Sequence, residues 1–146
     1  NSLAGLAMSV LDEAKNLKLN YIISSIDDKK NGIFIQLFEV NYIKNTPLPF
    51  VVKNDIVSIK KENLCNYFLV NRVTSKDILF VGHSSALIKK ITNLNVSKKL
   101  KQYPDSLGVG KLASCLIKNK ININKTIFAF DKFKPIYARP AQINIK

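Results

Sequence analysis

A run of four apolar residues, Ile78-Leu79-Phe80-Val81, is followed directly by Gly82 and restricts the fold more than any other segment. A short continuous apolar run that ends at a glycine is typical of a strand with both faces buried. Such a strand requires a neighbouring strand on each side and helices over both faces of the sheet. The run therefore predicts an α/β fold with this strand in the middle of the sheet.

A hairpin is predicted earlier in the chain. Residues 19–27 and 33–43 are rich in Ile and other strand-forming side chains. Between them, Asp28, Asn31 and Gly32 are residue types that favour turns. We therefore expect two adjacent antiparallel strands joined by a tight turn.

Two more strands are predicted after the hairpin. Pro47 and Pro49 first interrupt regular structure, because proline cannot donate a hydrogen bond to a neighbouring strand. A third strand is then expected around residues 55–59, and a weak strand near residues 94–96.

The first segment predicts an amphipathic helix over residues 1–18, with Ser2 positioned to cap it. Its apolar residues recur at intervals of three and four, which places them on one stripe. They are Leu3, Leu6, Ala7, Val10, Leu11, Ala14 and Leu17.

Three later segments follow the same helical periodicity. Ser84 or Ser85 is positioned to cap the second of them, and Pro104 and Asp105 suit the first turn of the third. The three helices are expected from residue 58 or 60 to about 73, over residues 86–91, and over residues 104–118.

The element order is therefore α-βββ-α-β-α-β-α. Hairpin strands followed by alternating helices and strands predict a mixed sheet of about five strands flanked by helices. This order is similar to that of the ribonuclease-H-like domain in the actin, hexokinase and heat-shock ATPase group. With 146 residues and 47% apolar content, the chain can bury one core of ordinary size.

The bulk properties constrain location and partners. No apolar run approaches the roughly 18 residues that cross a bilayer, so we expect a soluble, cytoplasmic protein without membrane contact. The net charge of +13 would suit an anionic partner such as RNA. However, only Arg72 and Arg139 are arginines, and the abundance of Lys, Asn and Ile is what adenine- and thymine-rich codons produce. The charge is therefore explained equally by codon composition.

Three segments resemble one known family, the TsaB subunits of the bacterial machinery that makes threonylcarbamoyladenosine in tRNA. They are NSLAGLA at residues 1–7, IDDKKNGIF at residues 26–34 and KPIYAR at residues 134–139. The positions that match the family motifs are Asp27, Gly32, Pro135, Tyr137 and Arg139. Departures are Asp28-Lys29 in place of Ala-Arg, Ile33-Phe34 in place of Glu-Val-Tyr, and Ala138 in place of Leu.

The resemblance implies a function without catalysis. TsaB proteins, also called glycoprotease-like, pair with the catalytic subunit TsaD and act with the ATPase TsaE, so that contact with tRNA is indirect. It also implies that residues 1–18 form a helix carried over from the end of a missing first domain. Residues 19–146 would form the second ribonuclease-H-like domain and a C-terminal tail, and the fragment could form a homodimer in isolation.

The residues themselves offer few candidates for an active site. Asp27 and Asp28 are the only adjacent carboxylates, whereas metal-dependent nucleases need several that converge. We interpret both as turn-capping residues. His83 beside Ser84 and Ser85 invites a base-and-nucleophile hypothesis, but no nucleophile-elbow motif surrounds either serine. A structural histidine is the simpler interpretation.

The glycines and cysteines do not predict a ligand-binding site. The turn at residues 82–85 resembles a phosphate loop in position, but it serves equally as a turn and a helix cap. Gly108 and Gly110 suit close packing or a helix irregularity. Cys65 and Cys115 are isolated, which favours small core residues in a reducing compartment over a disulfide or redox role.

Accordingly, no catalytic, cofactor-binding or metal-binding residue is predicted, and no cofactor. For Tyr137 and Arg139 the sequence favours docking on the sheet edge and pairing with a carboxylate over contact with a partner or RNA. Two alternatives to the scaffold remain open at this point. One is an active fragment of a sugar-kinase-like or glycoprotease-like member of the same fold group, and the other is a basic RNA-binding module.

Overall fold

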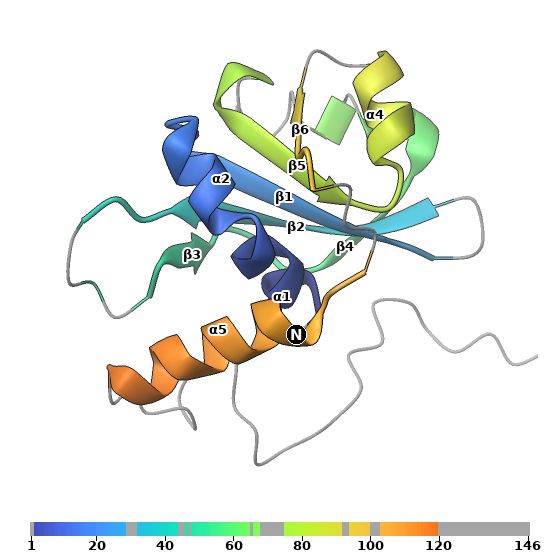
Figure 1. The fold of residues 1–146 in the computed structure, drawn as a ribbon. Helices are drawn as coiled ribbons and strands as arrows, with labels where there is room; N and C mark the ends of the chain where they lie inside the picture. The colour runs from blue at the N-terminus through green and yellow to red at the C-terminus, as the bar shows by residue number, and fades with distance from the viewer. Residues whose placement is uncertain are drawn as a thin grey trace, which may run out of the picture.

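The computed structural model describes residues 2–28, 32–43, 46, 48–64, 66–67, 75–91, 94–99 and 103–119. Figure 1 shows a twisted sheet with helices on both faces. The helices are α1 (Ser2–Ser9), α2 (Leu11–Asn16), α4 (Ser85–Ile91) and α5 (Ser106–Lys118), with short 3-10 helices at Lys61–Asn63 and Ser75–Asp77. The strands are β1 (Tyr21–Asp27), β2 (Gly32–Val40), β3 (Phe50–Val52), β4 (Val57–Lys60), β5 (Ile78–Gly82) and β6 (Asn95–Val96).

Within the described residues the sheet is mixed, as predicted, and has six strands in the order β3-β2-β1-β5-β6, with β4 also pairing with β2. β1 and β2 form the expected antiparallel hairpin, in which Tyr21 lies opposite Glu39 and Asp27 opposite Ile33. β5 runs parallel to both β1 and β6, and all of its residues are buried. The prediction that β5 lies inside the sheet is confirmed, as is the α/β fold of the ribonuclease-H-like type.

The segment between the hairpin and β5 differs from the sequence prediction. One strand was expected at residues 55–59, whereas β3 and β4 both pair with β2, β3 near one end of it and β4 near the other. β3 lies directly after the proline-rich break and has only three residues, so it carries too short a pattern to predict. Where the next helix was expected to begin, the chain forms the 3-10 helix Lys61–Asn63. Residues 68–74 of that predicted helix lie outside the described residues.

The prediction of one amphipathic entry helix is wrong. The helix is divided at Val10 into α1 and α2, and every residue of α1 from Leu3 to Ser9 is buried. Side chains all round the axis of α1 are therefore buried. The sheet lies on one side of this helix and α5 on another (Figure 1). Ser2, expected as the cap, is the first residue of the helix.

Two apolar clusters fill the two faces of the sheet. One lies under α1, α2 and α5, and includes Leu6, Phe38 and Leu79. Within it the rings of Phe38 and Phe50 meet edge to face, with centroids 5.0 Å apart. The other lies on the opposite face under α4 and includes Ile23, Phe80 and Ile88. Alternate residues of β1 and β5 supply both clusters, as expected for strands buried on both faces.

α5 packs against α1 at a point where both helices carry a glycine. A Cβ atom added to Gly108 would lie 2.3 Å from the backbone oxygen of Gly5. A Cβ added to Gly5 would lie 2.9 Å from Cγ2 of Val109. Only hydrogen in place of a side chain permits this separation, so close packing is the role of Gly108. The added Cβ of Gly110 meets no atom of the described residues within 4 Å, so close packing against them is not the role of Gly110.

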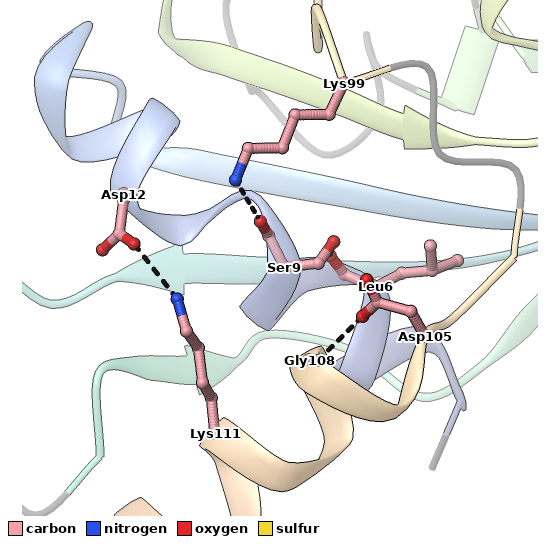
Figure 2. A network of polar contacts seen from close by, with 7 residues as sticks. All are labelled: Leu6, Ser9, Asp12, Lys99, Asp105, Gly108 and Lys111. Carbon is pink, nitrogen blue, oxygen red and sulfur yellow. Dashed lines mark hydrogen bonds and ion pairs between the residues drawn. The ribbon is translucent and has the colours of Figure 1, made fainter.

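Polar contacts border this helix pair (Figure 2). The Asp105 side chain accepts a hydrogen bond of 2.8 Å from the Gly108 amide, which makes Asp105 the N-cap of α5. The helix thus begins one residue after the acidic residue that was expected inside its first turn. Lys111 Nζ lies 3.4 Å from Asp12 Oδ2 in α2, and Lys99 Nζ donates to the Ser9 carbonyl at 2.8 Å.

A further carboxylate joins α2 to the chain after β6. Glu13 accepts hydrogen bonds from the Ser97 hydroxyl at 2.6 Å and from the Lys98 amide at 2.9 Å. The helix is therefore held to the sheet edge by polar bonds as well as by its buried residues Leu11 and Ala14. Among the helices of the described residues, none combines the length and the apolar character that a membrane span requires.

Candidate functional site

The sequence candidates gather at one edge of the sheet. β1 and β5 are parallel neighbours, with Ser25 opposite Gly82, so the chain leaves both strands at the same edge. In open α/β sheets, ligands bind outside the carboxyl ends of parallel strands. The turn after β1 holds Asp27 and Asp28, and the turn after β5 holds His83 to Ser85. This edge is the candidate site.

Asp28 closes the hairpin turn. Its Oδ1 atom accepts a hydrogen bond of 2.9 Å from the Gly32 amide, and its own amide donates to the Gly32 carbonyl at 3.1 Å. This is the turn role that the sequence predicted for Asp28. Gly32, one of the family-motif positions, is therefore the residue that Asp28 binds to close the turn.

Asp27 has a different role from its neighbour. Its Oδ2 atom lies 3.6 Å from Nζ of Lys61, which belongs to the 3-10 helix after β4. Both side chains are about 30% exposed, so water screens much of their attraction. Asp27 was predicted to cap the turn. Instead it forms an ion pair that joins the end of β1 to the segment after β4.

The turn after β5 depends on a backbone conformation that suits glycine and on hydrogen bonds to β1. Gly82 has a φ of 113°, and an added Cβ would lie 2.0 Å from the Ser25 carbonyl oxygen. The His83 amide donates to that carbonyl at 3.1 Å, and the Ser25 hydroxyl donates to the His83 carbonyl at 2.5 Å. Only glycine fits at residue 82, because a side chain would displace these bonds.

The serines of this turn serve the local structure. The Ser84 carbonyl accepts from the Ile88 amide at 2.8 Å, which gives Ser84 the cap position of α4. The Ser85 hydroxyl donates to the Gly82 carbonyl at 2.6 Å instead of accepting from a helix amide. Ser84 has a φ of 68°, so Gly82 and Ser84, on either side of His83, both have a positive φ before the helix begins. Of the two expected caps, Ser84 is the one at the cap position.

The His83 ring packs against an aromatic ring. The rings of His83 and Tyr103 meet edge to face, with centroids 4.4 Å apart and planes at 84°. The Nδ1 atom of His83 is buried and has no hydrogen-bond partner within the described part of the chain. This packing supports the structural interpretation of His83. The sequence offered no signal for Tyr103 as its neighbour, because the two residues are distant in the chain.

The remaining candidates fall into two groups. Pro135, Tyr137 and Arg139 lie outside the described residues, as do Arg72 and Cys65. Cys115 is a free, half-buried thiol packed against the apolar cluster under α1, in agreement with the predicted core role. Over the ranges that the structure describes, no three His, Cys, Asp or Glu side chains are grouped closely enough to hold a metal ion.

Comparison with known proteins shows that the fold of this chain is similar to that of a solved structure. A crystal structure of an uncharacterized protein with similarity to peptidase YeaZ, from Pseudomonas aeruginosa, superposes with a TM-score of 0.62 at 13% identity. The match covers 95% of this chain and 57% of the other, so this chain spans little more than half of that protein's length. No family model matches the sequence, and no curated protein matches it significantly.

Proposed function

We propose that this chain is a non-catalytic subunit of the TsaB type, which pairs with a TsaD-type subunit that carries out threonylcarbamoyl transfer to tRNA adenosine next to the anticodon. A TsaE-type ATPase acts with this pair, and tRNA contacts this chain only indirectly. The observation that carries the proposal is the likeness of fold to a YeaZ-like protein, because YeaZ is another name for TsaB. The motif positions Asp27 and Gly32 support it, since both lie at the hairpin turn.

The contacts at the candidate edge favour a scaffold over an enzyme. Catalysis by paired carboxylates requires that they converge on a metal or a reacting group. Here Asp28 closes the turn to Gly32, and Asp27 pairs with Lys61. The Ser85 hydroxyl is engaged with the Gly82 carbonyl. Asp28 and Ser85 therefore maintain the shape of two turns and Asp27 joins β1 to the segment after β4, which suits a subunit that acts through its surface.

The direct test is purification of the protein from cells that express its complete gene, followed by identification of the proteins that accompany it. We expect a TsaD-type subunit in near-stoichiometric amount, with a TsaE-type ATPase at lower yield. Recovery without any TsaD-type protein would overturn the proposal. A preparation that instead retains tRNA in a strongly salt-dependent manner would favour the RNA-binding alternative.

A second measurement separates the scaffold from an enzyme of the same fold group. The purified protein is assayed for nucleotide hydrolysis beside Asp27→Asn, and Lys61→Gln serves as the matched control that breaks the same ion pair from its other side. A scaffold gives equal background rates in all three proteins. Hydrolysis that Asp27→Asn abolishes and Lys61→Gln preserves would identify Asp27 as a catalytic carboxylate.

A further inference from the structure

Three large apolar side chains are exposed at one end of the sheet. Leu17, Tyr42 and Ile43 are 49%, 45% and 74% exposed. Leu17 is the C-cap of α2, and Tyr42 and Ile43 come directly after β2 and Asn41. Figure 1 shows α2 and the end of β2 at the same end of the molecule. We call these three residues the tip, together with the lysines at residues 15 and 18 on either side of Leu17.

Hydrogen bonds hold the two chain segments of the tip together. The Tyr42 hydroxyl donates to the Leu19 carbonyl at 2.7 Å and lies 3.4 Å from the Ala14 carbonyl. The Val40 amide donates to the Asn20 carbonyl at 2.8 Å. The tip is therefore formed before any partner arrives, so binding there requires little further ordering.

The tip carries positive charge and no carboxylate. Its two chain segments, residues 14–20 and 40–43, contain no Asp or Glu. Neither lysine of the tip forms an ion pair with a residue that the structure describes. The carboxylates that flank the two segments are already engaged, Glu13 by the Ser97 hydroxyl at 2.6 Å and Glu39 by a lysine at 2.8 Å. The lysine charges at the tip therefore attract an anionic partner.

Lys18 carries its charge at a position that suits glycine. It lies directly after the C-cap of α2 and has a φ of 55°, in the left-handed region. Glycine is the usual residue after a helix C-cap in this conformation, because it has no Cβ. The local fold therefore does not explain a lysine at this position.

We propose that the tip binds a membrane surface that contains anionic lipids. Exposed aliphatic side chains enter the boundary between headgroups and acyl chains, and lysines beside them attract anionic headgroups. Tyrosine is enriched at the same boundary, because its ring is apolar and its hydroxyl is polar. A second copy of the chain would bring like charges together at the tip, whereas an anionic lipid surface complements them.

This contact requires no spanning helix, and none of the described helices has the length and apolar character of one. It departs from the sequence-based expectation of a chain without membrane contact, which depended on the length of apolar runs alone. The inference goes beyond the proposed function and does not depend on it.

The test is co-sedimentation of the purified whole chain with vesicles. One set is phosphatidylcholine alone, and the other is phosphatidylcholine mixed with phosphatidylglycerol, which is anionic. Lys18→Gly removes a charge from the tip, and Ile43→Ser removes an apolar side chain. The matched controls are Lys89→Gln on α4 and Leu107→Ser on α5, both at exposed positions outside the tip. Thermal melting establishes that each variant is folded, and Lys18→Gly should be at least as stable as the unchanged protein.

We expect the unchanged protein to bind the mixed vesicles and to be released by salt, with little binding to phosphatidylcholine alone. Lys18→Gly should weaken binding about fivefold, the factor that one lysine near an anionic surface contributes. Ile43→Ser should weaken it by about fivefold to tenfold, because less apolar surface leaves water. Both controls should bind nearly as tightly as the unchanged protein.

Three results would overturn the proposal. The first is absence of binding to the mixed vesicles. The second is an equal loss in Lys18→Gly and Lys89→Gln, because net charge and not the tip would then cause the binding. The third is weaker binding of both tip variants to a purified TsaD-type subunit while their vesicle binding stays unchanged, because a protein would then be the occupant of the tip.

Discussion

The two faces of α5 are built from the same helix but are packed in opposite ways. Toward α1, Gly108 approaches the Gly5 backbone without room for a Cβ, and Leu112 and Leu116 enter the apolar cluster. Away from α1, Gly110 has space beside it, and Leu107 and Ile117 are exposed. Residue type alone therefore does not indicate burial, since each face combines glycine with large aliphatic side chains. Substitutions on the two faces should therefore differ in the sign and in the size of their effects.

Leu112→Ala should give the largest effect. Leu112 is 5% exposed within the cluster under α1, so its truncation removes buried apolar surface and leaves a cavity. We expect a loss of about 2 to 5 kcal/mol in the free energy of unfolding, measured by urea denaturation. Ile43→Ala is the control, because Ile43 is 74% exposed and its truncation should cost less than about 0.5 kcal/mol. Equal losses in the two variants would contradict the assignment of the inward face.

Gly108→Ala should rank next. The added methyl group meets a backbone oxygen at 2.3 Å, and a backbone atom cannot rotate away as a side-chain end can. We expect a loss of about 1 to 3 kcal/mol, as for other overpacked sites, even though alanine favours helix over glycine. The loss of stability is measured by comparing the melting temperatures of the variant and the unchanged protein at equal concentration. A variant as stable as the unchanged protein would mean that α1 and α5 separate more easily than their packing implies.

Asp105→Ala should cost less than either packing change. It removes the carboxylate that accepts from the Gly108 amide at the start of α5. The loss of an N-cap side chain costs about 0.5 to 2 kcal/mol. Asp105→Ser or Asp105→Asn should restore most of that loss in urea denaturation, because both side chains cap helices well. Failure of both to restore stability would show that Asp105 acts through another contact.

Gly110→Ala should produce the smallest effect, and one of opposite sign to Gly108→Ala. The new methyl group meets no described atom within 4 Å, so only the intrinsic helix preference changes. Alanine is favoured over glycine inside a helix by about 0.5 to 1 kcal/mol, and the variant should gain that amount. The two glycine variants form a matched pair on one helix. A loss at Gly110 similar to that at Gly108 would remove the distinction between the faces.

The sequence predicted the parts of the fold that depend on local pattern. The β1 and β2 hairpin follows from two Ile-rich segments around Asp28 and Gly32, and β5 follows from its continuous apolar run. α5 was predicted to within two residues of its start, because Pro104 and Asp105 are typical of the beginning of a helix and the apolar stripe after them is regular. These elements are determined mainly by residues close to one another in the chain.

The features that sequence reasoning missed depend on contacts between distant segments. α1 looked amphipathic because its apolar spacing is helical, but Ala4, Gly5 and Ser9 are small enough to be buried on its remaining sides. Gly5 carried a signal, since glycine inside a helix disfavours it unless another backbone comes close. At the candidate edge, the turn role of Asp28 was predicted correctly. The ion pair between Asp27 and Lys61 was not predicted, because it depends on the position of β4 and no local sequence pattern indicates it.

The contact between α1 and α5 also sets the order in which the molecule can fold. Asp12, in the helix α2 that follows α1, and Lys111 of α5 are 99 positions apart in the sequence, so packing α5 against this part of the chain closes a very long loop, whereas the hairpin closes a short one. During synthesis α1 leaves the ribosome well before α5, so the side of α1 that α5 covers is buried only later. For that interval an apolar helix surface remains open to water. The nascent chain therefore depends on rapid sheet assembly, or on a chaperone, to avoid aggregation before α5 arrives.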